Sequence, residues 1–357
     1  MINFINDIIH NPNFTFIDVR SEDEFSDGHL PGALNIPILI NEHRKLVGTC
    51  YKEKGQNEAI QLGHRLVGPL KKDYLEKWKK ALEQNPEQRK YVHCWRGGLR
   101  SKLTQKWIQE MGLQVELVEG GYKAVRNHLL LNFEADYHLI VVSGLTGTGK
   151  SRLLEKLNQK NVIDLEKYAN HRGSAFGHFH KRTQSSQQYF ENQLALKLYE
   201  KQFVYAVEHE SRFVGKNIIP PHFFSQINKA PQIILTAPIN ERVESIYKEY
   251  VKTEINDLNK ESIKGLKNKM MTSLKQISKK LGGVLYKEIE SDMGNAFSDF
   301  GDCEKHYVWI KKLLEVYYDK LYSYSQKSHK DQQCIFQGNI IECEEFLQSY
   351  ISRRGTL

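Results

Sequence analysis

Short apolar runs alternate with segments of helical periodicity along the first part of the chain. Residues 14–19 (FTFIDV) and 91–93 (YVH) predict two buried strands, residues 101–111 carry apolar side chains at helical spacing, and residues 113–118 predict another strand. A strand, a loop, a helix and a strand in this order are typical of a parallel α/β sheet. We therefore expect one α/β domain over residues 1–131.

A second α/β pattern begins at residue 137, where the apolar run YHLIVVS predicts a strand that leads into a glycine-rich loop and a helix from Ser151. The other elements predicted in this part are strands at residues 162–165, 203–207 and 232–235 and a helix at residues 187–201. From Glu241 onward the pattern is mostly helical. The sequence thus predicts a second α/β domain over residues 132–357 with a helical tail.

Composition narrows the classes of protein that fit this pattern. With 40% hydrophobic and 26% charged residues, the 357-residue chain has the balance of a soluble globular protein. The net charge of +8 favours a polyanionic partner such as nucleic acid, although a solubilising surface would have the same charge. Lysines are concentrated in the helical tail, at Lys264, Lys267, Lys269, Lys275, Lys279 and Lys280. Their alternative interpretations are a contact with a nucleic-acid backbone and a solvated helix face.

Cysteine usage and apolar runs indicate the compartment. The chain has five cysteines without any C-x-x-C pair, at Cys50, Cys94, Cys303, Cys334 and Cys343. This number is too small for a disulfide framework in a chain of this length. The first residues lack a basic stretch followed by an apolar run, and no run approaches the roughly 20 residues that span a bilayer. We therefore expect a cytoplasmic protein without a membrane segment.

The string YVHCWRGGLRS places Cys94 between a predicted strand and a predicted helix. Loop amides and the positive end of a helix dipole converge at such a position and stabilise a thiolate. Gly97 and Gly98 allow the loop to curl toward the sulfur, and Arg96 and Arg100 add positive charge for the thiolate or for a substrate oxyanion. A lone cysteine is commonly a buried apolar residue, but these neighbours favour a reactive Cys94.

The string GLTGTGKS fits the phosphate-loop pattern G-x-x-x-x-G-K-[ST] and follows an apolar strand. Gly144, Gly147 and Gly149 free backbone amides to point at phosphate oxygens, and Lys150 supplies a cation to the terminal phosphate. Ser151 is a candidate ligand for Mg²⁺. The pattern predicts phosphate binding, but it does not say which phosphate compound binds.

Acidic residues follow two other predicted strands of the second domain. Asp164 and Glu166 end one strand, and Glu208 and Glu210 follow another. Either pair is a candidate for holding a metal ion or orienting a nucleophile, and the alternative is a solvated strand end.

The first domain resembles the rhodanese family. Besides the Cys94 loop, the strings IDVR, EF and GHLPGA between residues 17 and 33 are similar to the amino-terminal signature of that family. Within the first string, Asp18 and Arg20 are candidates for catalysis. A structural pair that fixes the loop is the interpretation we prefer.

The whole chain resembles the tRNA 2-selenouridine synthase family. The order of the two motifs carries the resemblance, together with the strings NEHR at residues 41–44, NHRGS at 170–174 and EHESR at 208–212. It implies a transferase acting on wobble 2-thiouridine in tRNA, in two reactions. Geranyl diphosphate would first alkylate the sulfur, with its diphosphate leaving group on the phosphate loop. Selenophosphate would then supply selenium, which Cys94 would handle. The HRGS turn adds His171 and Arg172 as candidate phosphate contacts.

Two other functions fit the same motifs. One is an ATP-dependent sulfurtransferase or small-molecule kinase with a rhodanese appendage. The other is a non-catalytic nucleotide-sensing or tRNA-binding module, which would leave Cys94 inert. We expect no tightly bound cofactor, and a monomer is compatible with the sequence. The set of tRNAs, the need for metal, covalent selenium on Cys94 and the position of a geranyl pocket are left open by the sequence.

Overall fold

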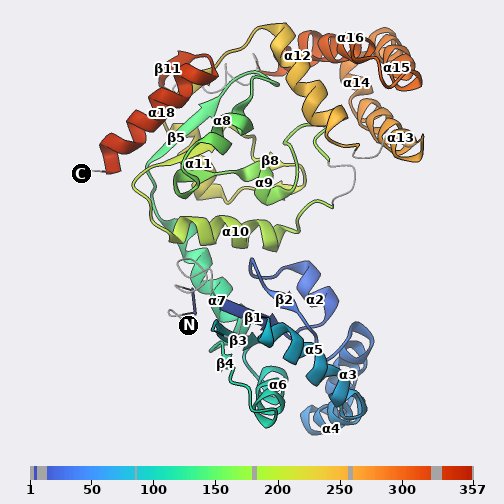
Figure 1. Cartoon of the computed structure of the whole chain (residues 1–357), viewed down its shortest axis with the longest axis vertical. Helices are drawn as coiled ribbons and strands as arrows, with labels where there is room; N and C mark the ends of the chain where they lie inside the picture. Colours follow the sequence, from blue (N-terminus) through green and yellow to red (C-terminus); the bar gives the residue numbers. More distant parts are fainter. Residues whose placement is uncertain are drawn as a thin grey trace. The chain divides into compact units, whose positions relative to one another are not determined.

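The computed structural model of the chain describes residues 4–5, 14–84, 87–178, 183–255, 260–322 and 332–355. The chain divides into two compact units, one of residues Met1–Phe133 with Ser186–Glu200 and one of residues Glu134–Ser185 with Lys201–Leu357. Each unit contains a parallel sheet with helices (Figure 1), which confirms the α/β class expected from the sequence. The boundary expected after residue 131 stays a prediction. The contacts additionally place Ser186–Glu200, which follows that boundary in the sequence, in the first unit.

The sheet of the first unit has four parallel strands in the order β2-β1-β3-β4. Their bounds are Leu34–Asn35 (β2), Phe14–Asp18 (β1), Arg89–His93 (β3) and Glu116–Leu117 (β4). The strand predicted over residues 113–118 is therefore two residues long, although Val115 and Val118 on either side of it are buried. The apolar core of this unit includes Ile17 of β1 and Val92 of β3. Burial of both central strands is expected in a parallel sheet, which is covered on its two faces.

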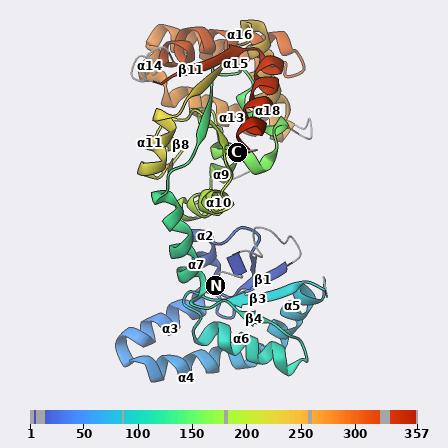
Figure 2. The same ribbon diagram turned by 90° about the vertical axis from the view of Figure 1, so that its left-hand side faces the viewer.

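The helices of the first unit are α2 (Glu22–Asp27), α3 (Asn41–Lys54), α4 (Gln56–Val67), α5 (Lys71–Glu83), α6 (Leu99–Glu110), α7 (Gly121–Leu130) and α10 (Gln187–Tyr199), with 3₁₀ turns at Gly68–Leu70 and Leu131–Glu134. Helix α5 buries Trp78 and Leu82 in the core. Helices α3 and α4 instead lie beside each other as a hairpin (Figure 2), and α3 has no buried residue. Helix α3 therefore adds little to the core of this unit.

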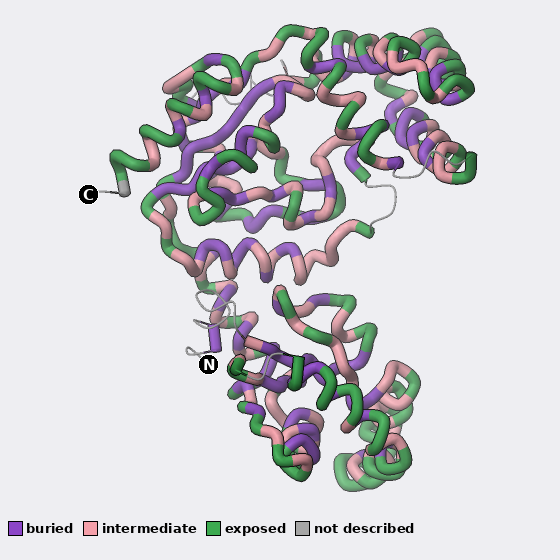
Figure 3. The backbone as a smooth tube through the Cα atoms, viewed as in Figure 1, coloured by how far each residue is buried: buried purple, intermediate pink, exposed green. Residues whose placement is uncertain are grey.

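The sheet of the second unit has five parallel strands in the order β11-β10-β5-β7-β6. Their bounds are Cys334–Gly338 (β11), Gln232–Leu235 (β10), Leu139–Ser143 (β5), Tyr205–Glu208 (β7) and Val162–Ile163 (β6). All five residues of β5 are buried (Figure 3). Strands added after β5 lie on both of its sides, so the carboxyl end of β5 is the switch point where such sheets bind ligands.

The remaining strands of this unit, β8 (Phe213–Val214) and β9 (Asn217–Ile218), form a hairpin. Its helices are α8 (Lys150–Lys156), α9 (Leu165–Ala169), α11 (Pro221–Lys229), α12 (Ile239–Tyr247), α13 (Lys260–Gln276), α14 (Ser278–Leu281), α15 (Gly283–Ser298), α16 (Cys303–Leu313) and α18 (Ile340–Gly355), with a 3₁₀ turn at Gln159–Asn161 and π-helical turns η4 (Lys248–Lys252) and η5 (Leu314–Tyr318). Helices α12 to α16 enclose a second apolar core. The tail after Glu241 is thus mostly helical as predicted, but it also contributes the edge strand β11, which the sequence pattern did not predict.

Candidate active site

Cys94 is the first residue after strand β3, in the first unit. Its side chain is buried, and its Sγ lies 3.3 Å from Oγ of Ser101 in the first turns of α6. The Ser101 hydroxyl also donates a hydrogen bond of 3.1 Å to the carbonyl of Gly98. Ser101 is therefore a polar neighbour of the sulfur that the sequence motifs did not single out.

The Cys94 loop packs against the turn that precedes α7. Gly97 and Gly121 have φ of +65° and +62°, which side chains rarely adopt. A Cβ on Gly121 would stand 2.4 Å from the carbonyl oxygen of Cys94 and from the amide of Gly97. The amide of Tyr122 donates to that same carbonyl at 2.9 Å. The pair Gly120–Gly121 before a helical pattern is the one signal in the sequence that points to this contact.

The other residues expected to support the thiolate differ in their surroundings. Gly98 has a negative φ and open space where a Cβ would stand, so this position does not require glycine. Arg96 is exposed. Arg100 donates from both terminal nitrogens to the carboxylate of Glu24, at 2.5 and 3.0 Å. Burial alone would raise the pKa of Glu24, but the hydrogen bonds and charge of Arg100 outweigh burial and lower it to about 2. The charge of Arg100 is thus already compensated, whereas that of Arg96 faces solvent.

The ion pair between Asp18 and Arg20 is fully buried, which supports the structural role preferred from the sequence. The Arg20 guanidinium donates to Oδ1 of Asp18 at 3.0 Å, to Oδ2 at 2.6 Å, and to the carbonyl of Gly28 at 2.8 Å. The guanidinium carbon of Arg20 lies 4.0 Å from the centre of the Tyr122 ring. The backbone amide of Tyr122 donates the hydrogen bond to the Cys94 carbonyl. Removing either partner of the ion pair would leave an uncompensated buried charge beneath the Cys94 loop.

The phosphate loop connects β5 to α8 in the second unit. Gly144, Gly147 and Gly149 all have positive φ, at 150°, 83° and 92°. A Cβ on Gly144 would stand 2.5 Å from a backbone oxygen of β10, so even alanine would displace the loop. The Lys150 ammonium folds over the loop and donates to the carbonyl of Gly144 at 3.1 Å. These glycines and this lysine have the arrangement that the motif predicted for binding phosphate.

Carboxylates from two strand ends lie beside the phosphate loop. The Ser151 hydroxyl donates to Glu166 at 3.2 Å, and the amide of Glu166 donates to Glu208 at 2.8 Å. Glu166 and Glu210 both border Gly173, where a Cβ would stand 3.0 and 2.7 Å from their oxygens. The structure therefore brings Glu166, Glu208 and Glu210 to one place next to Ser151, as their positions after parallel strands imply.

Crowding of these carboxyl groups makes them retain protons. Burial raises the pKa of Glu166 to about 7, because the opposing charge of Lys150 offsets it only in part and repulsion from Asp164 adds to it. Burial and repulsion from Glu166 raise that of Glu210 to about 8. Burial, with Asp164 and Glu166, raises the pKa of Glu208 well above its usual value. At neutral pH the cluster is thus partly protonated and able to exchange protons with a substrate.

Asp164 has a structural contact of its own, because its side chain caps helix α9 by accepting from the amide of Lys167 at 2.7 Å. Among the residues that the structure describes, no group of three or more His, Cys, Asp and Glu side chains is arranged to hold a metal ion. Mg²⁺ commonly takes one or two protein ligands and completes its shell with phosphate oxygens and water. Ser151 and Glu166 fit that requirement, and magnesium binding by Ser151 stays a prediction.

His171 and Arg172 begin a turn next to these carboxylates. Burial, followed by the charges nearby, lowers the pKa of His171 to about 4, so its ring is neutral at pH 7. Its Nδ1 accepts from the amide of Gly173 at 3.1 Å. Arg172 pairs with Glu254 at 2.9 Å and lies 4.8 Å above the ring of Tyr250. His171 therefore shapes the turn as a hydrogen-bond acceptor, and contact of His171 and Arg172 with phosphate stays a prediction.

The lysines of the tail differ in exposure. Lys264 and Lys275 of α13 and Lys279 and Lys280 of α14 are exposed, as a polyanion contact requires. Lys269 instead lies 3.8 Å from Glu254, with its side chain 17% exposed. Burial lowers the pKa of Lys269 to about 8 despite the attraction of Glu254. Lys269 thus belongs to the Arg172–Glu254 contact and not to the exposed lysine surface.

Together, these features define a two-domain protein in which a rhodanese-like cysteine loop is joined to a P-loop domain. The rhodanese-like domain family matches residues 3–128, and the family described as tRNA 2-selenouridine synthase AAA domain matches residues 137–354. Proteins named tRNA 2-selenouridine synthase are similar over nearly the whole chain. That of Shewanella frigidimarina is 36% identical over 95% of this chain and 96% of its own length. That of Shewanella sediminis is 38% identical over 94% of both chains, and that of Nitrosomonas eutropha 37% over 93% of both.

The chain therefore belongs to the tRNA 2-selenouridine synthase family, a family of tRNA-modifying transferases. In the described part of the chain, every helix is too short or too polar to cross a membrane.

Proposed function

We propose that this chain converts wobble 2-thiouridine in tRNA to 2-selenouridine by two reactions, with geranyl diphosphate and then selenophosphate as co-substrates. One observation carries the proposal: the chain combines a buried cysteine loop and a complete phosphate loop with a cluster of proton-retaining carboxyl groups. Family membership supports the overall conversion, since the relatives are named for it. The two-step route and its co-substrates are our inference.

In the first reaction, the thiouridine sulfur attacks the allylic carbon of geranyl diphosphate. A carbon–sulfur bond forms, the carbon–oxygen bond breaks, and diphosphate leaves. Loop amides and Lys150 stabilise the charge that develops on the diphosphate. Alkylation at sulfur also requires the loss of the uracil N3 proton. Glu166 and Glu210, with pKa values near neutrality, are suited to accept it.

In the second reaction, the selenium of selenophosphate attacks C2 of the base, the bond between C2 and sulfur breaks, and geranylthiol leaves with a proton. Water then attacks phosphorus, the selenium–phosphorus bond breaks, and inorganic phosphate is released. The alkylated sulfur is the better leaving group, which explains why alkylation comes first. Cys94, with Ser101 at its sulfur, is the residue suited to handle a soft selenium species. The proposed route thus uses the phosphate loop to form the carbon–sulfur bond and the Cys94 loop to form the carbon–selenium bond.

Two variants test this division. Cys94→Ser should accumulate geranylthio-tRNA when it is given both co-substrates, because serine holds its proton far more tightly than cysteine. Lys150→Ala should lose geranyl transfer, since a charge-assisted interaction with a leaving group is worth about 3 kcal/mol. Mass spectrometry of tRNA nucleosides measures both. Parental selenouridine formation by Cys94→Ser would remove Cys94 from the selenium step.

A protection experiment separates the proposal from an ATP-dependent enzyme. Geranyl diphosphate should protect the second unit from proteolysis better than ATP at equal concentration. Stronger protection by ATP together with ADP formation would instead indicate a kinase or an ATP-dependent sulfurtransferase.

A further inference from the structure

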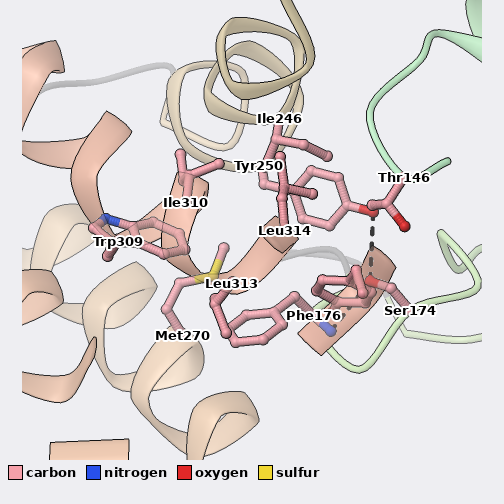
Figure 4. Close-up of a pocket in the computed structure, with 11 residues that line it drawn as sticks. Thr146, Ser174, Phe176, Ile246, Tyr250, Met270, Trp309, Ile310, Leu313 and Leu314 are labelled. Carbon is pink, nitrogen blue, oxygen red and sulfur yellow. Dashed lines mark hydrogen bonds between the residues drawn. The ribbon is translucent and has the colours of Figure 1, made fainter. Parts of the chain in front are cut away.

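An apolar cavity lies beside the phosphate loop within the second unit. Thr146, Ser174 and Tyr250 place their hydroxyl groups at one end of it, and Met270 and Trp309 line the other end (Figure 4). Leu313 and Leu314 line it as well, and both are buried. The cavity therefore has a polar end and an apolar end.

The polar end belongs to the phosphate site. Thr146 is a residue of the phosphate loop, and Ser174 follows Gly173, which borders the carboxylates of Glu166 and Glu210. The hydroxyl of Tyr250 lies 3.4 Å from that of Ser174, so η4 and the turn that contains Ser174 meet here. A ligand whose phosphates occupied the loop would have this cavity directly beside it.

Both π-helical turns of the second unit's described residues contribute to the cavity. Turn η4 supplies Tyr250, and turn η5 supplies Leu314 and Tyr318. A π-turn replaces hydrogen bonds between residues four apart by bonds between residues five apart, and such turns are frequent at functional sites. Two π-turns from helices distant in sequence line the same cavity. We take this as an indication that the cavity binds a ligand.

We propose that this cavity receives the hydrocarbon chain of the allylic diphosphate, with the chain entering past Ser174 and Tyr250 and ending against Met270 and Trp309. The proposal rests on the proposed function, because it assigns the chain of the same substrate whose diphosphate occupies the loop. The cavity has a volume of about 30 Å³, which holds a water-sized group but not a ten-carbon chain. A ten-carbon chain thus requires the inner side chains to move, and the flexible Met270 is able to do so.

Chain-length preference tests the assignment. Each methylene group transferred from water into an apolar site favours binding by about fourfold. Leu313→Phe fills the cavity and should lower the kcat/KM for geranyl diphosphate at least tenfold relative to dimethylallyl diphosphate. Met270→Ala should raise the kcat/KM for farnesyl diphosphate relative to geranyl diphosphate. Leu347→Phe is the matched control, because Leu347 is equally buried but packs in the sheet core.

Unchanged preferences in both cavity variants, or the same change in Leu347→Phe, would overturn the assignment while leaving geranyl transfer in place. Failure of the parent protein to transfer any of the three alkyl groups would instead overturn the proposed function.

A binding measurement tests the cavity's role without turnover. Trp309 is the only tryptophan in residues 134–357, and it lines the cavity. Geranyl diphosphate should change the tryptophan fluorescence of the parent protein, whereas inorganic diphosphate should not. The change should disappear in Trp309→Phe. Equal responses to both compounds, or a response that persists in Trp309→Phe, would contradict the assignment.

Discussion

The guanidinium of Arg242 donates a hydrogen bond of 2.9 Å to the carbonyl oxygen of Thr146 in the middle of the phosphate loop. Arg242 is 3% exposed, and Asp319 accepts from its other two nitrogens at 3.1 and 2.6 Å. The backbone of Arg242 also touches the loop, since a Cβ on Gly147 would stand 2.8 Å from its carbonyl oxygen. Helix α12 therefore supports the phosphate loop through the side chain and the backbone of Arg242.

Arg242→Lys should weaken the binding of inorganic diphosphate by about tenfold. Lysine keeps the positive charge near Asp319, but its single ammonium group cannot bond to Asp319 and to the carbonyl of Thr146 at the same time, as the planar guanidinium does. Losing a hydrogen bond of this kind corresponds to about 1.5 kcal/mol. Titration calorimetry measures the affinity. Asp319→Asn is the control: it removes the charge pair but keeps the bond to Thr146, so it should lower the melting temperature with less effect on affinity. Equal losses of affinity in both variants would argue against a role of Arg242 in positioning the loop.

Gly121→Ala should abolish selenium transfer, because its Cβ would stand 2.4 Å from the backbone of Cys94 and Gly97 and would displace the cysteine loop. Geranyl transfer in the second unit should persist. Gly98→Ala lies in the same loop but has open space at its Cβ, so it should keep selenium transfer within a few-fold of the parent. Nucleoside analysis by mass spectrometry compares the two. Similar behaviour of both variants would show that the packing of the loop on the α7 turn is not what positions Cys94.

The carboxyl cluster should make the free protein less stable as pH rises. The pKa of Glu166 is raised to about 7 and that of Glu210 to about 8, from 4.5. The folded protein holds these protons more tightly than the unfolded chain, so this stabilisation is full below pH 4.5 and is lost as pH rises through 7 to 8. Each carboxyl group contributes a slope of at most about 1.4 kcal/mol per pH unit.

Urea unfolding at several pH values between 5 and 8 measures this slope. Glu210→Gln should flatten it relative to the parent protein, because glutamine does not titrate. Glu244→Gln, at an exposed position outside the cluster, should leave it unchanged. A parental slope in Glu210→Gln would mean that Glu210 is already ionised in the folded protein at neutral pH.

The exposed lysines of α13 should contribute to tRNA binding. Lys264 and Lys275 are about three helical turns apart and share one face of the helix. Replacing both by glutamine should reduce the slope of log affinity against log salt by about 1 for each tRNA phosphate that is no longer neutralised. Replacing Lys160 and Lys229, which are also exposed on this unit, removes the same charge elsewhere and serves as the control. If the two double variants have the same slope, net charge and not this helix face accounts for the affinity.

The sequence by itself determined the features that depend on neighbouring residues. Strand β5, the glycines of the phosphate loop and Lys150 are adjacent in the chain, so their spacing already specifies the bend and the cation. Cys94 was recognisable for the same reason, because its strand, loop and helix lie within a few residues of one another.

Only the tertiary structure decided which groups from distant parts of the chain meet. Glu24 accepts hydrogen bonds from Arg100 and so compensates the positive charge that the sequence pattern assigned to the Cys94 thiolate. The turn at Gly121 supports the Cys94 loop, and the cavity joins Thr146 to Trp309. Helix α10 was predicted as a helix, but its contacts place it in the first unit. Contacts of this kind depend on which surfaces fit together when the core closes, and local spacing carries no information about them.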